Sequence, residues 1–200
     1  MEWDAIILAG GRGTRLGGVD KAELVVGGRT LLEAAVSATG NAEERCIVGP
    51  DRPGLQDSVR CVVEEPAHTG IAAAVDVGLR ELRGSDAAMV ALVAADQPSV
   101  DQALPVVLSE VWGGSSADGW IAADPYGSTF PLLGVYRKAS LERRIARLKR
   151  EDRLADASLG DLLEGLRLKP VRLLGYLCAD IDTPTDIRRL GLDPAQLLPV

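Results

Sequence analysis

The chain has 200 residues, of which 46% are hydrophobic and 4% aromatic, and its formal net charge at pH 7 is −7. A chain of this length and composition can bury one full hydrophobic core, so we expect a single domain over residues 1–200. The acidic balance argues against a general nucleic-acid surface, which needs a basic face, whereas a small anionic substrate can still be held by local cations.

Membrane and redox signals in the sequence are weak. The longest apolar runs, such as residues 87–95, are about half as long as a bilayer span, and residues 1–4 are acidic where a secretory signal would be basic. We therefore expect a soluble protein of the cytoplasm without membrane contacts. The cysteines lack the spacing of a zinc site, so we expect buried free thiols at Cys46, Cys61 and Cys178.

Strand-like segments rich in Val, Ile and Leu recur along the chain. We expect strands at residues 4–9, 45–49, 60–64, 87–95, 120–123, 132–137 and 171–176. Several of these segments are apolar on both faces, which is typical of a buried, mostly parallel sheet. Because helical patterns separate them, the chain predicts a three-layer α/β fold, in which ligands bind at the carboxyl ends of the strands.

Several helix boundaries can be located in the sequence. Three expected helices begin at a hydroxyl residue followed three positions later by an acidic one: Thr30 with Glu33, Ser158 with Asp161, and Thr183 with Asp186. The second of these is expected to cover residues 159–166. Another helix is expected over residues 71–83, where Gly84 ends it. Residues 143–153 alternate basic and apolar side chains at helical spacing, which we interpret as a solvated helix face and not as a binding patch.

The loop after the first strand is the most informative part of the chain. From Leu8 to Lys21 it reads Leu-Ala-Gly-Gly-Arg-Gly-Thr-Arg-Leu-Gly-Gly-Val-Asp-Lys. Glycines let main-chain N–H groups converge on an anion, and Arg12, Arg15 and Lys21 add positive charge. The loop lacks the Gly-Lys-Ser/Thr of a Walker motif, and Leu16 stands where the dinucleotide fingerprint needs its third glycine. It therefore predicts a nucleotide-phosphate loop of a different design, the alternative being an ordinary glycine-rich turn.

Acidic residues follow two other strand-like segments. Asp96 ends the most apolar strand, just before Gln97 and Pro98, where a bound hard cation would offset the burial of a carboxylate. The alternative is that Asp96 only caps this turn. Asp180 and Asp182 lie beyond the last expected strand with matching parity, so both can face one site, although Asp180 can equally be a solvated turn residue. Together with the glycine loop, these acids are expected at one edge of the sheet.

These three blocks resemble the signature of the molybdenum cofactor guanylyltransferases, a branch of the nucleotidyltransferases. The matching segments are residues 8–21, Ala95–Pro98 and Asp180–Ile187, which occur in the family's order and span nearly the whole chain. The resemblance implies a three-layer α/β/α Rossmann-like fold. It also implies transfer of GMP from GTP to the molybdenum–molybdopterin cofactor, with Mg²⁺ as the metal and pyrophosphate as the second product. Both substrates are small molecules, and the resemblance leaves room for transient contact with molybdoenzymes or other cofactor-synthesis proteins.

The resemblance also assigns roles to individual residues. The nucleotide would be bound by Leu8, Ala9, Gly10, Gly11, Lys21, Glu65 and Asp96; the catalytic residues would be Arg15, Lys21 and Asp96; Mg²⁺ would be held by Asp96 and Asp182. A carboxylate at position 65 can accept hydrogen bonds from N1 and N2 of guanine. The resemblance also implies that the Leu-Ala-Gly-Gly form of the loop favours guanine, since cytidylyl relatives usually read Leu-Ala-Ala-Gly.

The chain departs from the family pattern at three places. The family's acidic nucleotide-binding residue is Glu65 instead of an aspartate, and Asp182 stands where many members have asparagine. Residues 69–73 replace a Gly-Pro-Leu-Ala-Gly segment. These departures bear on base recognition, on acceptor recognition and on the second metal ligand.

Several alternatives to guanylyl transfer remain open. The nucleotide can be CTP, the acceptor can be a sugar phosphate or phosphoenolpyruvate, or the chain can be a catalytically silent nucleotide-binding module. The presence of Lys21 and Asp96 argues against silence. Trp112, Trp120 and Tyr126 can line an acceptor pocket or an interface, but we interpret them as packing residues.

Overall fold

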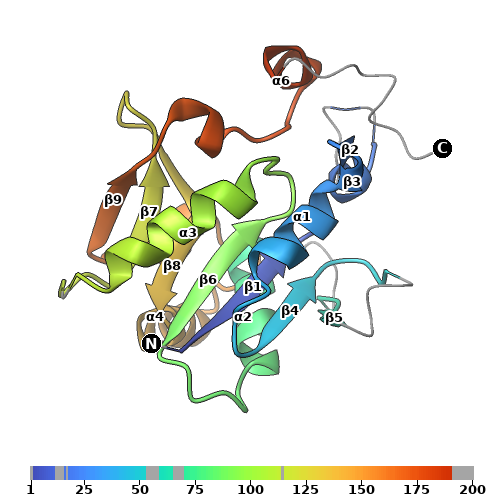
Figure 1. The fold of residues 1–200 in the computed structure, drawn as a ribbon. Helices are drawn as coiled ribbons and strands as arrows, with labels where there is room; N and C mark the ends of the chain where they lie inside the picture. Colours follow the sequence, from blue (N-terminus) through green and yellow to red (C-terminus); the bar gives the residue numbers. More distant parts are fainter. Residues whose placement is uncertain are drawn as a thin grey trace.

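The computed structural model describes residues 2–11, 16, 18–52, 59–64, 70–113 and 115–190. Its main sheet has seven strands in the order β5-β4-β1-β6-β8-β7-β9 (Figure 1). They are β1 (Trp3–Leu8), β4 (Arg45–Val48), β5 (Arg60–Val62), β6 (Met89–Ala94), β7 (Gly119–Ala123), β8 (Thr129–Arg137) and β9 (Leu168–Arg172). Neighbouring strands pair in parallel, except that β8 lies antiparallel between β6 and β7. The expected α/β fold with a mostly parallel sheet is confirmed.

Helices cover both faces of this sheet, which makes three layers (Figure 1). One face carries α1 (Leu31–Ala38) and α3 (Val100–Val111), and the other carries α2 (Ile71–Glu81), α4 (Lys138–Arg150) and α5 (Leu159–Leu163). Successive side chains of a strand point to opposite faces, so Ile7 belongs to the first core and Ile6 to the second. The sheet is therefore buried on both sides, which explains the continuous apolar runs of its central strands.

The three predicted helix starts are confirmed as capping boxes. Thr30 begins α1, Ser158 begins α5 and Thr183 begins α6 (Pro184–Arg189), and in each case the hydroxyl and the acidic side chain cap one another's backbone N–H groups. The second helix is shorter than expected, since α5 ends at Leu163. The local hydrogen bonds of a cap depend only on neighbouring residues, which is why sequence alone locates them.

The prediction of a strand over residues 171–176 is wrong at its carboxyl end. β9 is paired with β7 from Leu168 to Arg172, and β7 ends opposite that last residue. After one more backbone bond, from the Leu173 amide to the Ala123 carbonyl at 2.8 Å, the chain has no strand to follow. It turns into a 3-10 helix at Gly175–Cys178. The partner strand, and not the apolar composition, sets where β9 stops.

Besides the two 3-10 helices Lys21–Glu23 and Gly175–Cys178, two elements of the described residues have no counterpart among the predicted ones. They are helix α3 and a hairpin of β2 (Val25–Val26) and β3 (Arg29–Thr30). The amino end of α3 has no side-chain cap, and Pro105 lies inside the helix, so its local signals are poor. Its burial against α1 and the sheet stabilises it instead.

The basic stretch is only partly the solvated face that was predicted. α4 carries it, but Arg144 is buried and donates to the Asp161 carbonyl at 2.7 Å and to Glu164 Oε2 at 3.0 Å. This arginine ties α4 to α5, because both of its partners lie in or beside α5. A long side chain at the border between the buried and exposed faces of an amphipathic helix can lie along the apolar surface and reach a neighbouring element with its charged end.

The cysteines and the aromatic residues are only in part as buried as expected. Cys46 and Cys178 are buried free thiols, whereas Cys61 is half-buried, and burial raises the pKa of Cys46 to about 12. Trp120 is a core residue, but Trp112 and Tyr126 are exposed and are not packing residues. Within the described ranges, no helix has both the length and the apolar character needed to cross a membrane.

A buried ion pair at the amino end of the sheet yields a stability prediction. Asp4 on β1 is fully buried, and Lys138 Nζ lies 2.5 Å from its Oδ2. Lys138→Met is expected to lower the free energy of unfolding by about 3–5 kcal/mol, because the carboxylate stays buried without its partner. Urea unfolding measures this. Lys169→Met breaks only the exposed pair with Glu110 and should lower it by less than about 1 kcal/mol. Equal losses in the two variants would contradict the prediction.

Candidate active site

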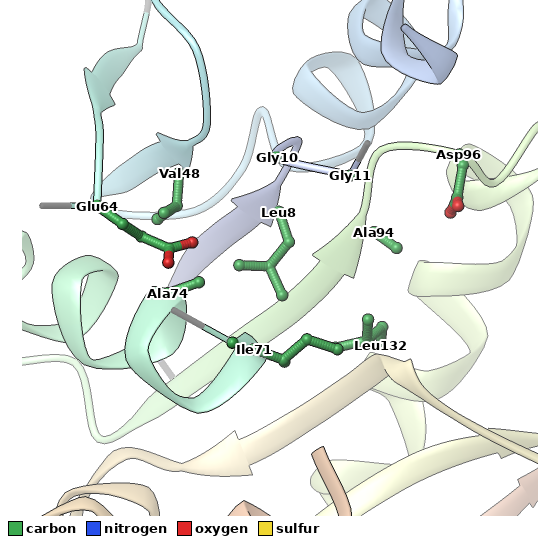
Figure 2. A pocket seen from close by; sticks show the side chains of 11 residues that line it. Leu8, Gly10, Gly11, Val48, Glu64, Ile71, Ala74, Ala94, Asp96 and Leu132 are labelled. Carbon is green, nitrogen blue, oxygen red and sulfur yellow. The ribbon is translucent and has the colours of Figure 1, made fainter. Parts of the chain in front are cut away.

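A cavity of about 540 Å³ opens at the carboxyl ends of the parallel strands. Its wall includes the last residues of β1, β4 and β6, and the first turn of α2 (Figure 2). The lining residues are Leu8, Gly10, Gly11, Val48, Glu64, Gly70, Ile71, Ala74, Ala94, Asp96 and Leu132. A mostly apolar cavity of this size, with a few polar groups, is typical of a small-molecule site.

The start of the glycine loop is held by close backbone packing. The Ala9 amide donates to the Val48 carbonyl at 2.9 Å, and a Cβ at Gly49 would lie 2.8 Å from the Ala9 carbonyl carbon. Only glycine permits this approach of the β4 end to the loop. A Cβ at Gly10 would meet nothing closer than Gly49 Cα at 3.8 Å, which is ordinary contact.

These distances predict different effects for two glycine substitutions. Gly49→Ala is expected to destabilise the fold by about 1–3 kcal/mol and to weaken nucleotide binding, because the new methyl group displaces the loop backbone. Gly10→Ala should leave stability within about 0.5 kcal/mol of the parent. Chemical unfolding and nucleotide titration measure both effects. The prediction fails if Gly49→Ala unfolds at the parent's denaturant concentration.

A second, smaller cavity of about 50 Å³ shares Leu8, Gly11 and Asp96 with the large one. Lys21, which begins the 3-10 helix Lys21–Glu23, lines it. The Lys21 ammonium lies 3.2 Å from Asp96 Oδ2 and also donates to the Asp182 carboxylate. In sequence, Asp96 lies 75 residues after Lys21 and Asp182 lies 161 residues after it, yet both side chains contact its ammonium.

Backbone contacts place Asp182 beside Asp96. The Ile181 amide donates to the Asp96 carbonyl at 3.0 Å, and the Ile181 side chain is buried with Leu24. Burial, together with the charges of Asp96 and Asp182, raises the pKa of Asp180, so Asp180 lies near this pair. The segment that carries Asp180 and Asp182 follows a 3-10 helix and is not a strand end.

Burial and charge shift the pKa values of this cluster. Burial raises the pKa of Asp96, against the lowering effect of the Lys21 charge, and burial likewise raises the pKa of Asp180 beside Asp96 and Asp182. Burial lowers the pKa of Lys21, but its hydrogen bond to Asp182 and the charges of both acids outweigh this and leave the pKa above its usual value. Lys21 is therefore a stable cation at neutral pH among an excess of acidic groups.

The donor set suits a hard divalent cation. Asp96 and Asp182 both reach the same ammonium group, so their carboxylates are close enough to share one cation. Within the described part of the chain, no group of three or more His, Cys, Asp or Glu side chains is arranged to hold a metal ion. Mg²⁺ is commonly held by one or two carboxylates together with substrate phosphates, and two carboxylates fit that pattern.

The structure brings most of the predicted site residues together. Leu8, Gly10, Gly11 and Asp96 line the large cavity, Ala9 and Lys21 line the small one, and Asp182 contacts Lys21. Arg15 and Glu65 lie outside the described residues, so their roles stay predictions.

Two residues at this edge were missed. Glu64 follows β5, and its side chain extends into the large cavity beside Val48 and Ala74 (Figure 2). Arg52 follows β4 and contacts the segment that carries Lys21. Glu64 could have been found from its place just after a strand, where ligand-binding residues gather. No local pattern marks Arg52.

An α/β sheet with a glycine loop, a lysine and paired carboxylates at its carboxyl edge is typical of proteins that bind nucleotides and act on their phosphates. The comparisons agree with this class. A family model described as the MobA-like NTP transferase domain matches residues 5–168. The chain belongs to this family of nucleotidyltransferases.

One curated relative shares a short segment with the chain. It is a molybdenum cofactor guanylyltransferase of Acidiphilium cryptum (strain JF-5), 64% identical over 33 residues. The match covers 16% of this chain and 17% of that relative.

Solved structures of three similar proteins support the Rossmann-like nucleotidyltransferase fold. Molybdopterin-guanine dinucleotide biosynthesis protein A from Archaeoglobus fulgidus is 18% identical, with a TM-score of 0.64 over 94% of this chain and 96% of that one. 2-C-methyl-D-erythritol 4-phosphate cytidylyltransferase from Thermus thermophilus is 22% identical, with a TM-score of 0.64 over 95% and 97%. A Mycobacterium tuberculosis H37Rv protein solved as a manganese complex is 19% identical, with a TM-score of 0.63 over 95% and 98%. At these identities the likeness shows the fold alone.

Proposed function

We propose that the protein is a molybdenum cofactor guanylyltransferase. It would join GMP from GTP to the terminal phosphate of the molybdenum–molybdopterin cofactor and release pyrophosphate. The observation that carries the proposal is the contact of Lys21 with Asp96 and Asp182 next to a nucleotide-sized cavity. The family and the short segment shared with a guanylyltransferase support the choice of reaction.

The large cavity is proposed to bind the nucleoside. Leu8, Val48, Ile71 and Leu132 offer apolar surface to the base, and Glu64 offers a carboxylate. A carboxylate accepts hydrogen bonds from N1 and N2 of guanine, whereas cytosine offers a single donor group on its pairing edge. Gly10 and Gly11, at the start of the glycine loop, are proposed to lie against the phosphates.

The small cavity is proposed to hold the reacting phosphates. An oxygen of the acceptor phosphate attacks the α-phosphorus of GTP, and the bond from that phosphorus to the oxygen of the β-phosphate breaks, so that pyrophosphate leaves. Lys21 would donate to phosphate oxygens and stabilise the charge that grows on the leaving group. Asp96 and Asp182 would hold Mg²⁺, which, when bound, neutralises phosphate charge. The acceptor phosphate is ionised at neutral pH and needs no protein base.

Pyrophosphate release from each of the four nucleoside triphosphates, with Mg²⁺ and with or without molybdopterin, tests the proposal. We expect release that requires both GTP and the cofactor. A preference for CTP would place the protein with the cytidylyl enzymes. Release only with a sugar phosphate or phosphoenolpyruvate would reassign the acceptor. Nucleotide binding without release under any of these conditions would favour a silent module.

Glu64 gives a prediction about base choice. Glu64→Gln is expected to raise KM for GTP by about 10- to 100-fold with a smaller change in kcat, because a hydrogen bond to a charged acceptor is lost. The preference for GTP over ITP, which lacks the 2-amino group, should narrow in the same variant. Glu44→Gln, which breaks an exposed pair with Arg60, is the matched control and should change neither value. An unchanged preference for GTP over ITP would remove Glu64 from base recognition.

A further inference from the structure

Arg52 is one of the most buried charged side chains among the described residues. It follows β4, and only 6% of the residue is exposed. It lines neither of the two cavities at the site. Arginine is almost never this buried unless it is paired, so its partners indicate what it does.

The partners of Arg52 come from both ends of the glycine loop. Its Nη2 donates to Asp20 Oδ2 at 2.7 Å and to the Ala9 carbonyl at 3.4 Å, and its Nη1 donates to the Glu23 carboxylate. Ala9 starts the loop, whereas Asp20 and Glu23 flank Lys21 at its end. The Arg52 guanidinium group therefore links the two ends of the loop and binds both acidic residues beside Lys21.

Asp20 divides its two carboxylate oxygens between separate tasks. Its Oδ1 accepts from the Ala22 amide at 3.1 Å and so caps the 3-10 helix that begins at Lys21. Its Oδ2 is the atom that Arg52 binds. The Asp20 carboxylate thus caps the backbone turn that carries Lys21 and, at the same time, has its own charge paired with Arg52.

The negative charges of Asp20 and Glu23 explain why Arg52 is needed between them. Asp20 and Glu23 lie one and two positions from Lys21, and their side chains are 41% and 44% exposed, so they are the nearest competitors in sequence for its ammonium. With Arg52 bound to both, Lys21 extends instead to Asp96 and Asp182. We infer that Arg52 is a positioning residue that directs Lys21 to the catalytic carboxylates by occupying the two acidic groups beside it. The inference rests on the proposed nucleotidyl transfer only for its kinetic readout.

Three variants test the inference through kcat for pyrophosphate release. Arg52→Met is expected to lower kcat by about 10- to 100-fold, the usual effect of losing a supporting partner, with a smaller change in KM for GTP. Arg52→Lys should recover little, because an ammonium cannot bind Asp20, Glu23 and the Ala9 carbonyl as a planar fork does. The triple variant Arg52→Met, Asp20→Asn, Glu23→Gln removes the competing charges as well, and asparagine still caps Ala22. It should recover much of the lost kcat.

A second readout needs no enzymatic activity. Acetylation of each lysine by a water-soluble reagent, followed by peptide mass spectrometry, compares Lys21 with the exposed Lys169. Lys21 should react slowly in the parent, approach the rate of Lys169 in Arg52→Met, and become protected again in the triple variant. This pattern supports the inference even if GTP and molybdopterin prove to be the wrong substrates. Parent-like kcat and protection in Arg52→Met, or a triple variant as impaired and as reactive as Arg52→Met, overturns it.

Discussion

Asp96→Asn is expected to lower pyrophosphate release by roughly 10²- to 10³-fold or more while the protein remains folded. The side chain lines both cavities and contacts Lys21 at 3.2 Å, so it lies where nucleotide, metal and lysine would meet. Asparagine keeps the shape and one acceptor oxygen but loses the negative charge that binds a hard cation.

Steady-state rates and metal titration measure the effect of Asp96→Asn. Mn²⁺ binding followed by electron paramagnetic resonance should weaken together with kcat. Asp101→Asn is the matched control, because Asp101 lies five positions later in a pair with Arg29 at 2.6 Å and outside both cavities. It should retain the parent's rate and metal affinity. A parent-like rate for Asp96→Asn would remove this residue from the proposed metal site.

Lys21→Met is expected to lower kcat by roughly 10²- to 10³-fold as well, for a different reason. The substitution removes the cation that would stabilise the leaving pyrophosphate and leaves Asp96 and Asp182 without their shared partner. Metal binding should therefore survive in Lys21→Met, and it can tighten because the two carboxylates no longer have a competing ammonium. This result separates the two variants: Asp96→Asn should lose both metal affinity and kcat, whereas Lys21→Met should lose kcat alone.

Lys21→Arg should not restore the activity of Lys21. A planar guanidinium is larger than an ammonium, and the cavity around Lys21 measures only about 50 Å³. Lys169→Met, at an exposed position, controls for the loss of one positive charge from the chain. Full activity in Lys21→Met, or loss of metal binding equal to that of Asp96→Asn, would contradict the assigned division of roles.

The features that sequence predicted well are those set by neighbouring residues or by a strand with two buried faces. The capping boxes at Thr30, Ser158 and Thr183 and the apolar central strands are of this kind. The end of β9 was missed because it is set by the length of its partner strand β7, and the residues of β9 carry no information on that length. Helix α3 was missed because tertiary burial, and not a cap, stabilises it.

The site shows the same division between local and distant information. The carboxyl ends of parallel strands meet at one edge, so the sequence alone could predict Asp96, Asp180, Asp182 and the glycine loop at that edge. The contact of Lys21 with Asp182 required the backbone bond from Ile181 to Asp96, which joins segments far apart in the chain. Arg52 could not be found because it lies about 30 residues after its partners, Asp20 and Glu23, and no local pattern reports these ion pairs.

The span of 161 residues between Lys21 and Asp182 has a consequence for the timing of synthesis. A ribosome makes the glycine loop and its lysine first and the second carboxylate much later, so a growing chain carries the loop long before it can complete the acidic pair. Over that interval the nascent chain carries Lys21 without Asp182, one of the two acids that contact its ammonium. Under the proposed mechanism, pyrophosphate release in a translation reaction would report only molecules whose synthesis has passed the segment around Asp182.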